Sequence, residues 1–162
     1  MAVIVLYTRI AAPRERVFDL SRSLDLHQAT VAHTGERIVA GVRSGLLELG
    51  QEVTWSAWHL GWRRRLRVTM SRLEYPSFFE DRMVKGAFRM MRHEHHFEED
   101  GENTMMMDRF EFEAPFGPLG RLFERRFLEA YMRRLLVRRN EGIKRIAESE
   151  EWRRYLEIPR RG

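Results

Sequence analysis

Residues 88–98 read FRMMRHEHHFE, and residues 104–114 read TMMMDRFEFEA. Within each segment apolar and polar side chains alternate, which predicts two β-strands with different faces. The polar residues 99–103 between them predict a hairpin loop. Residues 118–148 follow with apolar side chains at helical spacing and predict a long amphipathic helix. A curved hairpin closed by such a helix encloses either a packed core or a ligand cavity.

The remaining sequence extends this pattern towards the N-terminus. Residues 3–11 predict a first strand, followed by two short helices at 13–21 and 24–32, the second with Ser23 as its N-cap. Frequent glycines from Gly35 onward indicate a change to antiparallel sheet. Gly142 predicts a weak point or kink in the long helix. The fold class is therefore α+β, with about seven antiparallel strands in a curved sheet and a long C-terminal helix packed across it. The further strands expected from alternation cover residues 51–60, 65–70 and 78–84.

Length and composition favour one domain. The chain has 162 residues and 43% hydrophobic residues, enough for one core over residues 1–162, with a tail at 149–162. It contains no cysteine, which excludes disulfides and zinc–thiolate sites. No basic leader precedes the first apolar run, and no stretch reaches the roughly 18 apolar residues of a membrane span. We expect a soluble cytoplasmic protein, and the sequence leaves a homodimer open.

The positive charge is concentrated in the predicted helix. The formal net charge is +5, and residues 119–148 hold nine Lys or Arg against four Asp or Glu. A solvated helix face is the favoured interpretation. The alternative is an interaction protein that uses this face to bind an anionic surface or an acidic protein, with nucleic acid a less favoured partner. The arginines expected on the outer face are Arg125, Arg126, Arg133, Arg134, Arg138 and Arg139.

Several local motifs resemble one known superfamily. They are Thr8-Arg9-Ile10 before Ala12-Pro13 and Val17-Phe18, Val53-Thr54-Trp55, Phe79–Met83, His93–Phe97, Thr104–Asp108 and Pro115–Gly120. The chain resembles the START-like (SRPBCC) superfamily of polyketide cyclases, aromatic-ring oxygenase ligand domains, lipid-transfer domains and pollen allergens. Its closest resemblance is to the small bacterial ligand-binding members. This resemblance implies the helix-grip fold, in which the sheet wraps around the C-terminal helix.

The resemblance also implies a ligand site between sheet and helix. The expected guest is a hydrophobic or amphipathic small molecule such as a lipid, an isoprenoid or an aromatic, polyketide-like compound, bound without a cofactor. Methionine-rich walls suit such guests because the side chain is flexible and polarizable. A packed core remains the alternative. The residues expected to line the site are Trp55, Met70, Phe79, Met83, Met91, Met106, Phe110 and Phe112 from the sheet, and Phe123, Phe127, Tyr131 and Leu135 from the helix.

Four polar residues fall on the predicted apolar faces. His93 and His95 share one strand face, Asp108 lies among apolar neighbours, and Asp81 lies between Phe79 and Met83. A carboxylate there requires hydrogen bonds or a charged partner. The favoured interpretation is a satisfied polar network between strands. The alternative is a cofactor-free cyclase or dehydratase in which these residues act as acid and base.

Other catalytic templates receive little support. His93 and His95 with one carboxylate match a two-histidine, one-carboxylate metal site, but such pairs of histidines are common by chance, so we expect no metal. The sequence has no GxSxG, no Walker phosphate loop and no GxGxxG motif. A binding protein is therefore favoured over an enzyme.

Overall fold

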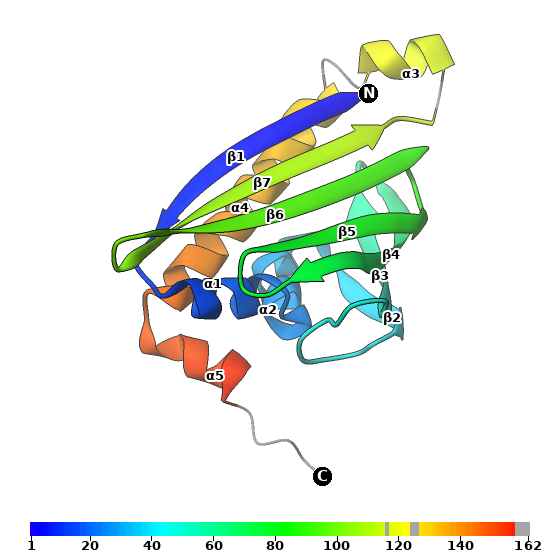
Figure 1. Cartoon of the computed structure of the whole chain (residues 1–162). Helices are drawn as coiled ribbons and strands as arrows, with labels where there is room; N and C mark the ends of the chain where they lie inside the picture. Colours follow the sequence, from blue (N-terminus) through cyan, green and yellow to red (C-terminus); the bar gives the residue numbers. More distant parts are fainter. Residues whose placement is uncertain (116, 124–126, 158–162) are drawn as a thin grey trace.

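The computed structural model describes residues 1–115, 117–123 and 127–157, without the side chains of residues 120, 121 and 123. Two short helices follow the first strand, six strands follow these helices, and further helices follow the last strand (Figure 1). The strands are β1 (Ala2–Ile10), β2 (Arg37–Gly41), β3 (Glu52–His59), β4 (Trp62–Glu74), β5 (Phe78–Lys85), β6 (Met90–Asp100) and β7 (Asn103–Glu113). The α-helices are α1 (Arg14–Ser21), α2 (Leu24–Thr30), α3 (Gly117–Phe123), α4 (Glu129–Ala147) and α5 (Arg153–Leu156), with 3-10 turns η1 (Ala32–Thr34) and η3 (Glu150–Trp152).

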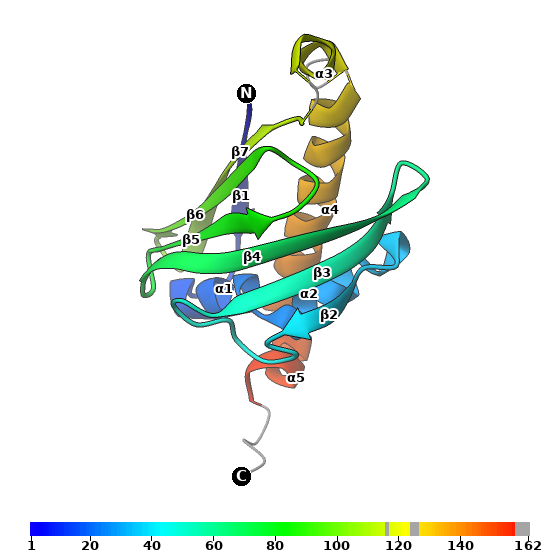
Figure 2. The same ribbon diagram turned by 90° about the vertical axis from the view of Figure 1, so that its right-hand side faces the viewer.

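The strands form one antiparallel sheet in the order β1-β7-β6-β5-β4-β3-β2. The sheet curves, and α4 crosses its concave side, as expected of a helix-grip fold (Figure 2). The register of β5, β6 and β7 sets Asp81 opposite His93 and His95 opposite Asp108. Residues far apart in sequence therefore meet on the concave face of three neighbouring strands.

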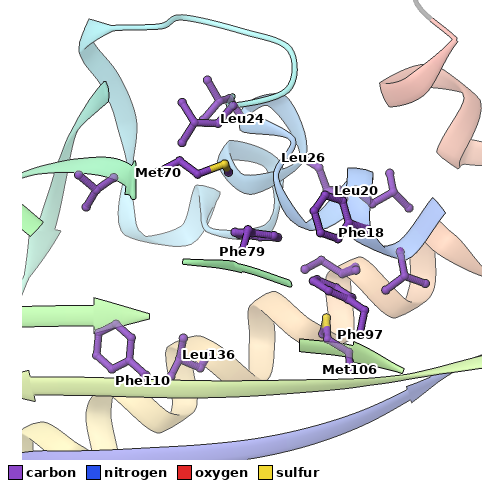
Figure 3. Close-up of a cluster of buried hydrophobic side chains, with 14 of the residues drawn as sticks. Phe18, Leu20, Leu24, Leu26, Met70, Phe79, Phe97, Met106, Phe110 and Leu136 are labelled. Atoms are coloured by element: carbon purple, nitrogen blue, oxygen red, sulfur yellow. The ribbon is translucent and has the colours of Figure 1, made fainter. Parts of the chain in front are cut away.

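The two short helices cover one end of the concave face. Ser23 caps α2 as predicted, since its side chain accepts a hydrogen bond from the Leu26 amide at 3.2 Å. Phe18 of α1 meets Phe97 of β6 with ring centroids 5.1 Å apart. Figure 3 shows this contact beside Met106, and it shows Phe110 of β7 next to Leu136 of α4. Full burial of each such side chain contributes roughly 1.5–3 kcal/mol, which fixes the helices against the sheet.

The β6–β7 hairpin is tighter than predicted. Both strands continue through the Asp100–Asn103 pair, so only Gly101 and Glu102 remain in the turn rather than residues 99–103. Gly101 has φ of 63°, a left-handed conformation that glycine adopts without steric cost. The polar side chains that suggested a loop are the exposed ends of two strands.

The C-terminal helix also differs from the prediction. Its expected span of 118–148 contains α3 and α4, and residues 124–126 between them lie outside the described residues. α4 continues through Gly142 rather than ending there. A Cβ at this position would overlap the methyl group of Thr30 on α2. Gly142 therefore permits close approach of two helices, and the expected weak point is a packing contact.

The tail returns to the body of the protein. Ser149 caps η3 by accepting a hydrogen bond from the Glu151 amide at 3.2 Å. The Arg16 guanidinium lies 4.2 Å from the ring centroid of Trp152, a cation–π contact between α1 and the tail. None of the described helices is long and apolar enough to cross a membrane.

The outer face of the sheet carries a charged cluster centred on Glu80 of β5. Its side chain is fully covered and accepts hydrogen bonds from Ser71 at 2.7 Å and from Arg82 and Arg92 at 2.6 Å each. Burial alone would raise the pKa of Glu80, but these three donors outweigh it and hold the pKa at about 2. Glu80 thus ties β4, β5 and β6 together beneath a layer of arginine.

Candidate functional site

A buried polar cluster lies where β7 faces α4. Asp108 is fully buried, and its Oδ1 accepts a hydrogen bond from His93 Nε2 at 2.9 Å. Asn140 Nδ2 donates to Oδ2 at 2.7 Å, and Arg139 Nη1 donates to Oδ1 at 3.4 Å. The carboxylate is therefore held by one strand residue and two helix residues, whereas the predicted polar network was formed between strands and included Asp81.

His95 is the less satisfied member of this cluster. Its Nδ1 lies 3.0 Å from Asp108 Oδ1, and its Nε2 lies 3.4 Å from Asp81 Oδ2. Neither contact has hydrogen-bond alignment, so both ring nitrogens are buried without a hydrogen-bond partner among the described residues. The ring stacks on Phe79 with centroids 4.1 Å apart and lies 3.8 Å from the His93 ring. Packing therefore fixes its orientation.

Arg139 occupies a different place from the one predicted. It was expected on the outer face of the helix, but it is buried and bonds Asp108, Asn140 Oδ1 at 3.0 Å and the Ser21 carbonyl at 3.1 Å. The sequence did contain a signal, because Arg139 lies three residues after Leu136 and four before Ile143, on the apolar stripe. The buried Asp108 explains why an arginine occupies a core position.

Electrostatics favours an ionised carboxylate beside a neutral imidazole. Burial would raise the pKa of Asp108, but the hydrogen-bonding His93, the nearby His95 and the Arg139 charge outweigh it and hold that pKa well below its ordinary value. Burial is also the main cause that lowers the pKa of His93 to about 4, with His95 adding to the effect and Asp108 opposing it. At neutral pH, His93 is thus an uncharged donor to a charged acceptor.

A cavity of about 290 Å³ adjoins this cluster between the sheet and α4. Most of its wall is apolar, and the polar groups on it include His93, His95 and Asp81. Asp108 is not among the lining residues, so it lies behind the two histidines. The predicted residues that line the cavity are Trp55, Met70, Phe79, Met91, Phe110, Tyr131 and Leu135.

The other predicted lining residues lie elsewhere. Met106 and Phe112 are fully buried in the packed core, and Met106 accepts a weak hydrogen bond from Ser21. Met83 packs against the core and Phe127 is 46% exposed, and neither is among the lining residues. The side chain of Phe123 lies outside the described residues. Part of the Met and Phe stripe is therefore core, as the alternative interpretation held.

A second polar group lines the cavity, and of its members only Trp55 and Tyr131 were predicted to line it. His59 Nδ1 and the Tyr131 hydroxyl are 2.8 Å apart and join the end of β3 to α4. His27 Nε2 lies 3.0 Å from Glu36 Oε1, and its ring packs on Trp55 with centroids 4.4 Å apart. These partners are separated by up to 72 residues, so no local pattern could have paired them.

His93, His95 and Asp108 have the donor types and proximity of a metal site. Their candidate ligand atoms lie within 4.8 Å of one another. A divalent cation, however, would replace the hydrogen bond from His93 to Asp108 and lie close to the Arg139 guanidinium. Both effects disfavour a metal ion, because the only carboxylate of the set already has a cationic partner.

The predicted basic surface of α4 does not include Arg139, which is buried. Arg133, Arg134 and Arg138 are exposed as expected, and the predicted Arg125 and Arg126 lie outside the described residues. Arg133 lies 3.9 Å from Glu129 in a weak ion pair. Arg64 of β4 adds an exposed cation at the edge of the cavity. An anionic partner for this surface stays a prediction.

Comparisons with known proteins agree with the fold. Residues 1–148 match the family described as polyketide cyclase / dehydrase and lipid transport. No match was found among curated proteins. Solved structures that resemble the chain include TTHA0849 from Thermus thermophilus (18% identity, TM-score 0.73, 89% of this chain and 95% of that one), the Zhui aromatase/cyclase from a Streptomyces species (16%, 0.71, 91% and 93%), and a START superfamily protein from Mycobacterium smegmatis (11%, 0.66, 88% and 97%).

Proposed function

The chain belongs to the family of polyketide cyclases, dehydrases and lipid-transport proteins, and from that premise we propose that it binds a hydrophobic or amphipathic small molecule between the sheet and α4. The observation that carries the proposal is the largely apolar cavity of about 290 Å³ with a few polar groups on its wall. Lipids, isoprenoids and aromatic or polyketide-like compounds have the matching chemistry. We also propose that residues 1–162 form one ligand-binding domain, since the tail packs back onto α1.

The energetics of such a complex are ordinary. A ligand that buries roughly 200–300 Å² of apolar surface gains about 5–8 kcal/mol at about 25 cal/mol per Å². Part of this gain is lost to the entropy of association, and micromolar affinity requires about 8 kcal/mol, so apolar burial alone supports a dissociation constant weaker than micromolar. Met70 and Met91 on the wall can adjust to guests of different shape.

Filling the cavity tests the proposal. Leu135→Trp places a larger side chain in the cavity wall, and Val137→Trp is a matched control on the exposed side of the same helix. Native mass spectrometry of purified protein should show a co-purifying apolar compound in the parent and in Val137→Trp, and much less in Leu135→Trp. In a titration with the fluorescent probe 1-aminoanthracene, the parent and Val137→Trp should likewise bind the probe, and Leu135→Trp should bind it more weakly. Equal probe binding by all three proteins, or none by any, would refute the proposed site.

A cofactor-free cyclase or dehydratase is the second candidate. It is favoured by one observation, that His93 and His95 line the cavity while the ionised Asp108 lies behind them. One structural neighbour is an aromatase/cyclase, which is consistent with it. A His93 pKa of about 4 makes that imidazole a weak base at neutral pH, so binding ranks first. This candidate predicts that the protein accelerates deuterium exchange at the central carbon of a 1,3-diketone and that His93→Gln abolishes the acceleration. If the parent protein does not accelerate the exchange, proton abstraction from such ketones is excluded.

A further inference from the structure

Three buried polar atoms of two cavity-lining residues lack a hydrogen-bond partner among the residues that the structure describes. They are Nδ1 and Nε2 of His95 on β6 and Oδ1 of Asp81 on β5. The His95 residue is 1% exposed, and both residues line the cavity. Buried polar groups are normally hydrogen-bonded, because an unpaired one costs roughly 1–3 kcal/mol. These atoms therefore identify one place on the wall where a bound molecule can gain a polar contact.

The unpartnered Asp81 Oδ1 is a carboxylate oxygen, which accepts hydrogen bonds and cannot donate one. His95 Nε2 lies 3.4 Å from Oδ2 of the same carboxylate, so the two side chains form one edge of the cavity wall. A hydroxyl group suits this edge, because it can donate to Asp81 whichever ring nitrogen of His95 carries the proton. A group that only accepts hydrogen bonds leaves Asp81 Oδ1 without a partner.

The neighbouring charges reinforce this selection. Asp81 and Asp108 place two carboxylates near the edge, and the Arg139 guanidinium is already bonded to Asp108, Asn140 and the Ser21 carbonyl. A ligand carboxylate at this end would face two anionic groups. A neutral hydroxyl group meets no such penalty.

We propose that the edge formed by His95 Nε2 and Asp81 selects ligands that carry a hydroxyl donor on an apolar body, and that it discriminates against carboxylates and against analogues without a donor. The inference rests on the proposed binding function, because it concerns one end of the same cavity. It adds the class of ligand, an alcohol or a phenol, and the orientation in which the hydroxyl group points at β5 and β6.

Four matched probes test the proposal by calorimetric titration of the full chain. They are 2-naphthol, 2-methoxynaphthalene, naphthalene and 2-naphthoate, which share one apolar body and differ in donor and charge. We expect 2-naphthol to bind about tenfold or more tightly than 2-methoxynaphthalene, as one hydrogen bond to a charged or buried acceptor implies. We expect 2-naphthoate to bind more weakly than 2-naphthol.

Two variants then locate the effect. His95→Phe keeps an aromatic ring on Phe79, and Asp81→Leu keeps the approximate shape of the side chain. In each, the preference for 2-naphthol over 2-methoxynaphthalene should fall towards onefold while naphthalene binding persists, which also shows that the cavity is intact. His96→Phe, on the opposite face of β6, is the matched control and should keep the preference.

The outcomes separate this inference from the proposed function. If naphthalene and its derivatives all bind with equal affinity, water satisfies the edge and the inference fails while the cavity function stands. The inference fails in the same way if 2-naphthoate binds most tightly, or if His95→Phe and Asp81→Leu both keep the full preference. If none of the four probes binds, the proposed function fails with it.

Discussion

Replacing Asp108 with Asn tests whether the buried cluster holds the fold together or is a site kept for chemistry. The substitution keeps the size of the side chain and removes its charge. In the parent protein Asp108 accepts hydrogen bonds from His93 at 2.9 Å and Asn140 at 2.7 Å and pairs with Arg139 at 3.4 Å. An Asn at 108 turns an amide donor towards the Asn140 amide donor and leaves Arg139 buried without an anion.

The expected loss follows from those contacts. Hydrogen bonds to a charged group contribute about 1.5–3 kcal/mol each, and removing one partner of a buried ion pair costs about 3–5 kcal/mol. We therefore expect Asp108→Asn to lower the free energy of unfolding by about 3–5 kcal/mol, a large share of the roughly 5–15 kcal/mol of a typical domain. Urea denaturation followed by circular dichroism measures the change, with the slope m checking that the unfolded state is unaltered.

A charge swap provides the matched control. The double variant Asp108→Asn with Asn140→Asp moves the carboxylate across the same hydrogen bond, and its new acceptor lies where Arg139 already donates at 3.0 Å. We expect it to regain at least about 1 kcal/mol over Asp108→Asn, because Arg139 again has an anion. A single variant as stable as the parent, or more stable, would refute the structural role and favour a strained functional carboxylate.

Three further predictions concern other parts of the molecule. Gly142→Ala should destabilise the protein by about 1–3 kcal/mol, although alanine has the better helix propensity, because the new Cβ overlaps the methyl group of Thr30. Thr30→Ser removes that methyl group and should relieve part of the loss in a double-mutant cycle measured by urea denaturation. Additive losses would contradict the contact between residues 30 and 142. Glu80 has a folded pKa of about 2 against 4.5, so its contribution is present above pH 4.5 and lost as the pH falls towards 2. Because solvent partly screens these charges, we expect the lowered pKa of Glu80 to contribute roughly 1–2 kcal/mol to the free energy of unfolding. Glu80→Gln and the parent protein should therefore differ by this amount at pH 7 and converge near pH 2. A difference that stays constant with pH would argue against the lowered pKa. We expect Arg134 and Arg138 to lie on a solvated face, so that replacing both with Glu changes the free energy of unfolding by less than about 0.5 kcal/mol. Neither the parent nor this double variant should sediment with anionic vesicles at about 0.15 M salt. Binding by the parent that is lost in the variant would instead identify an anionic partner.

Strand positions could be predicted from the sequence because alternation reports a sheet with one buried face. The even-numbered residues from Thr104 to Phe112 of β7 are buried, and the odd-numbered ones are partly buried except Glu111, which is buried as well. β6 alternates in the same way apart from the buried Glu94 and its exposed end. β2 could not be bounded in this way, since only Ile38 of Arg37–Gly41 is buried and the register shifts beside it. A short edge strand with a bulge has too little buried surface to leave a pattern.

The site was only half predictable, for a different reason. His93, His95, Asp81 and Asp108 stand out because polar residues on an apolar strand face are unusual. Arg139 was missed because arginine is normally exposed, and only its position on the apolar stripe of α4 indicated otherwise. Pairing Arg139 with Asp108 requires the packing of helix on sheet, which one sequence does not report.

The geometry divides the polar cluster into two parts with different consequences. On the α4 side, Asp108 accepts hydrogen bonds from His93, Arg139 and Asn140, so few acceptor positions remain for a ligand. Replacing Asp108 should therefore mainly lower the free energy of unfolding. On the β5 side, His95 Nε2 and Asp81 Oδ1 have no hydrogen-bond partner among the described residues, and both side chains line the cavity. Replacing either residue should therefore mainly change which ligands the protein prefers. The two halves meet at His95, whose Nδ1 lies 3.0 Å from Asp108 Oδ1. A loss of hydroxyl preference in Asp108→Asn, measured at a temperature where the variant remains folded, would show that the two halves are coupled through this ring.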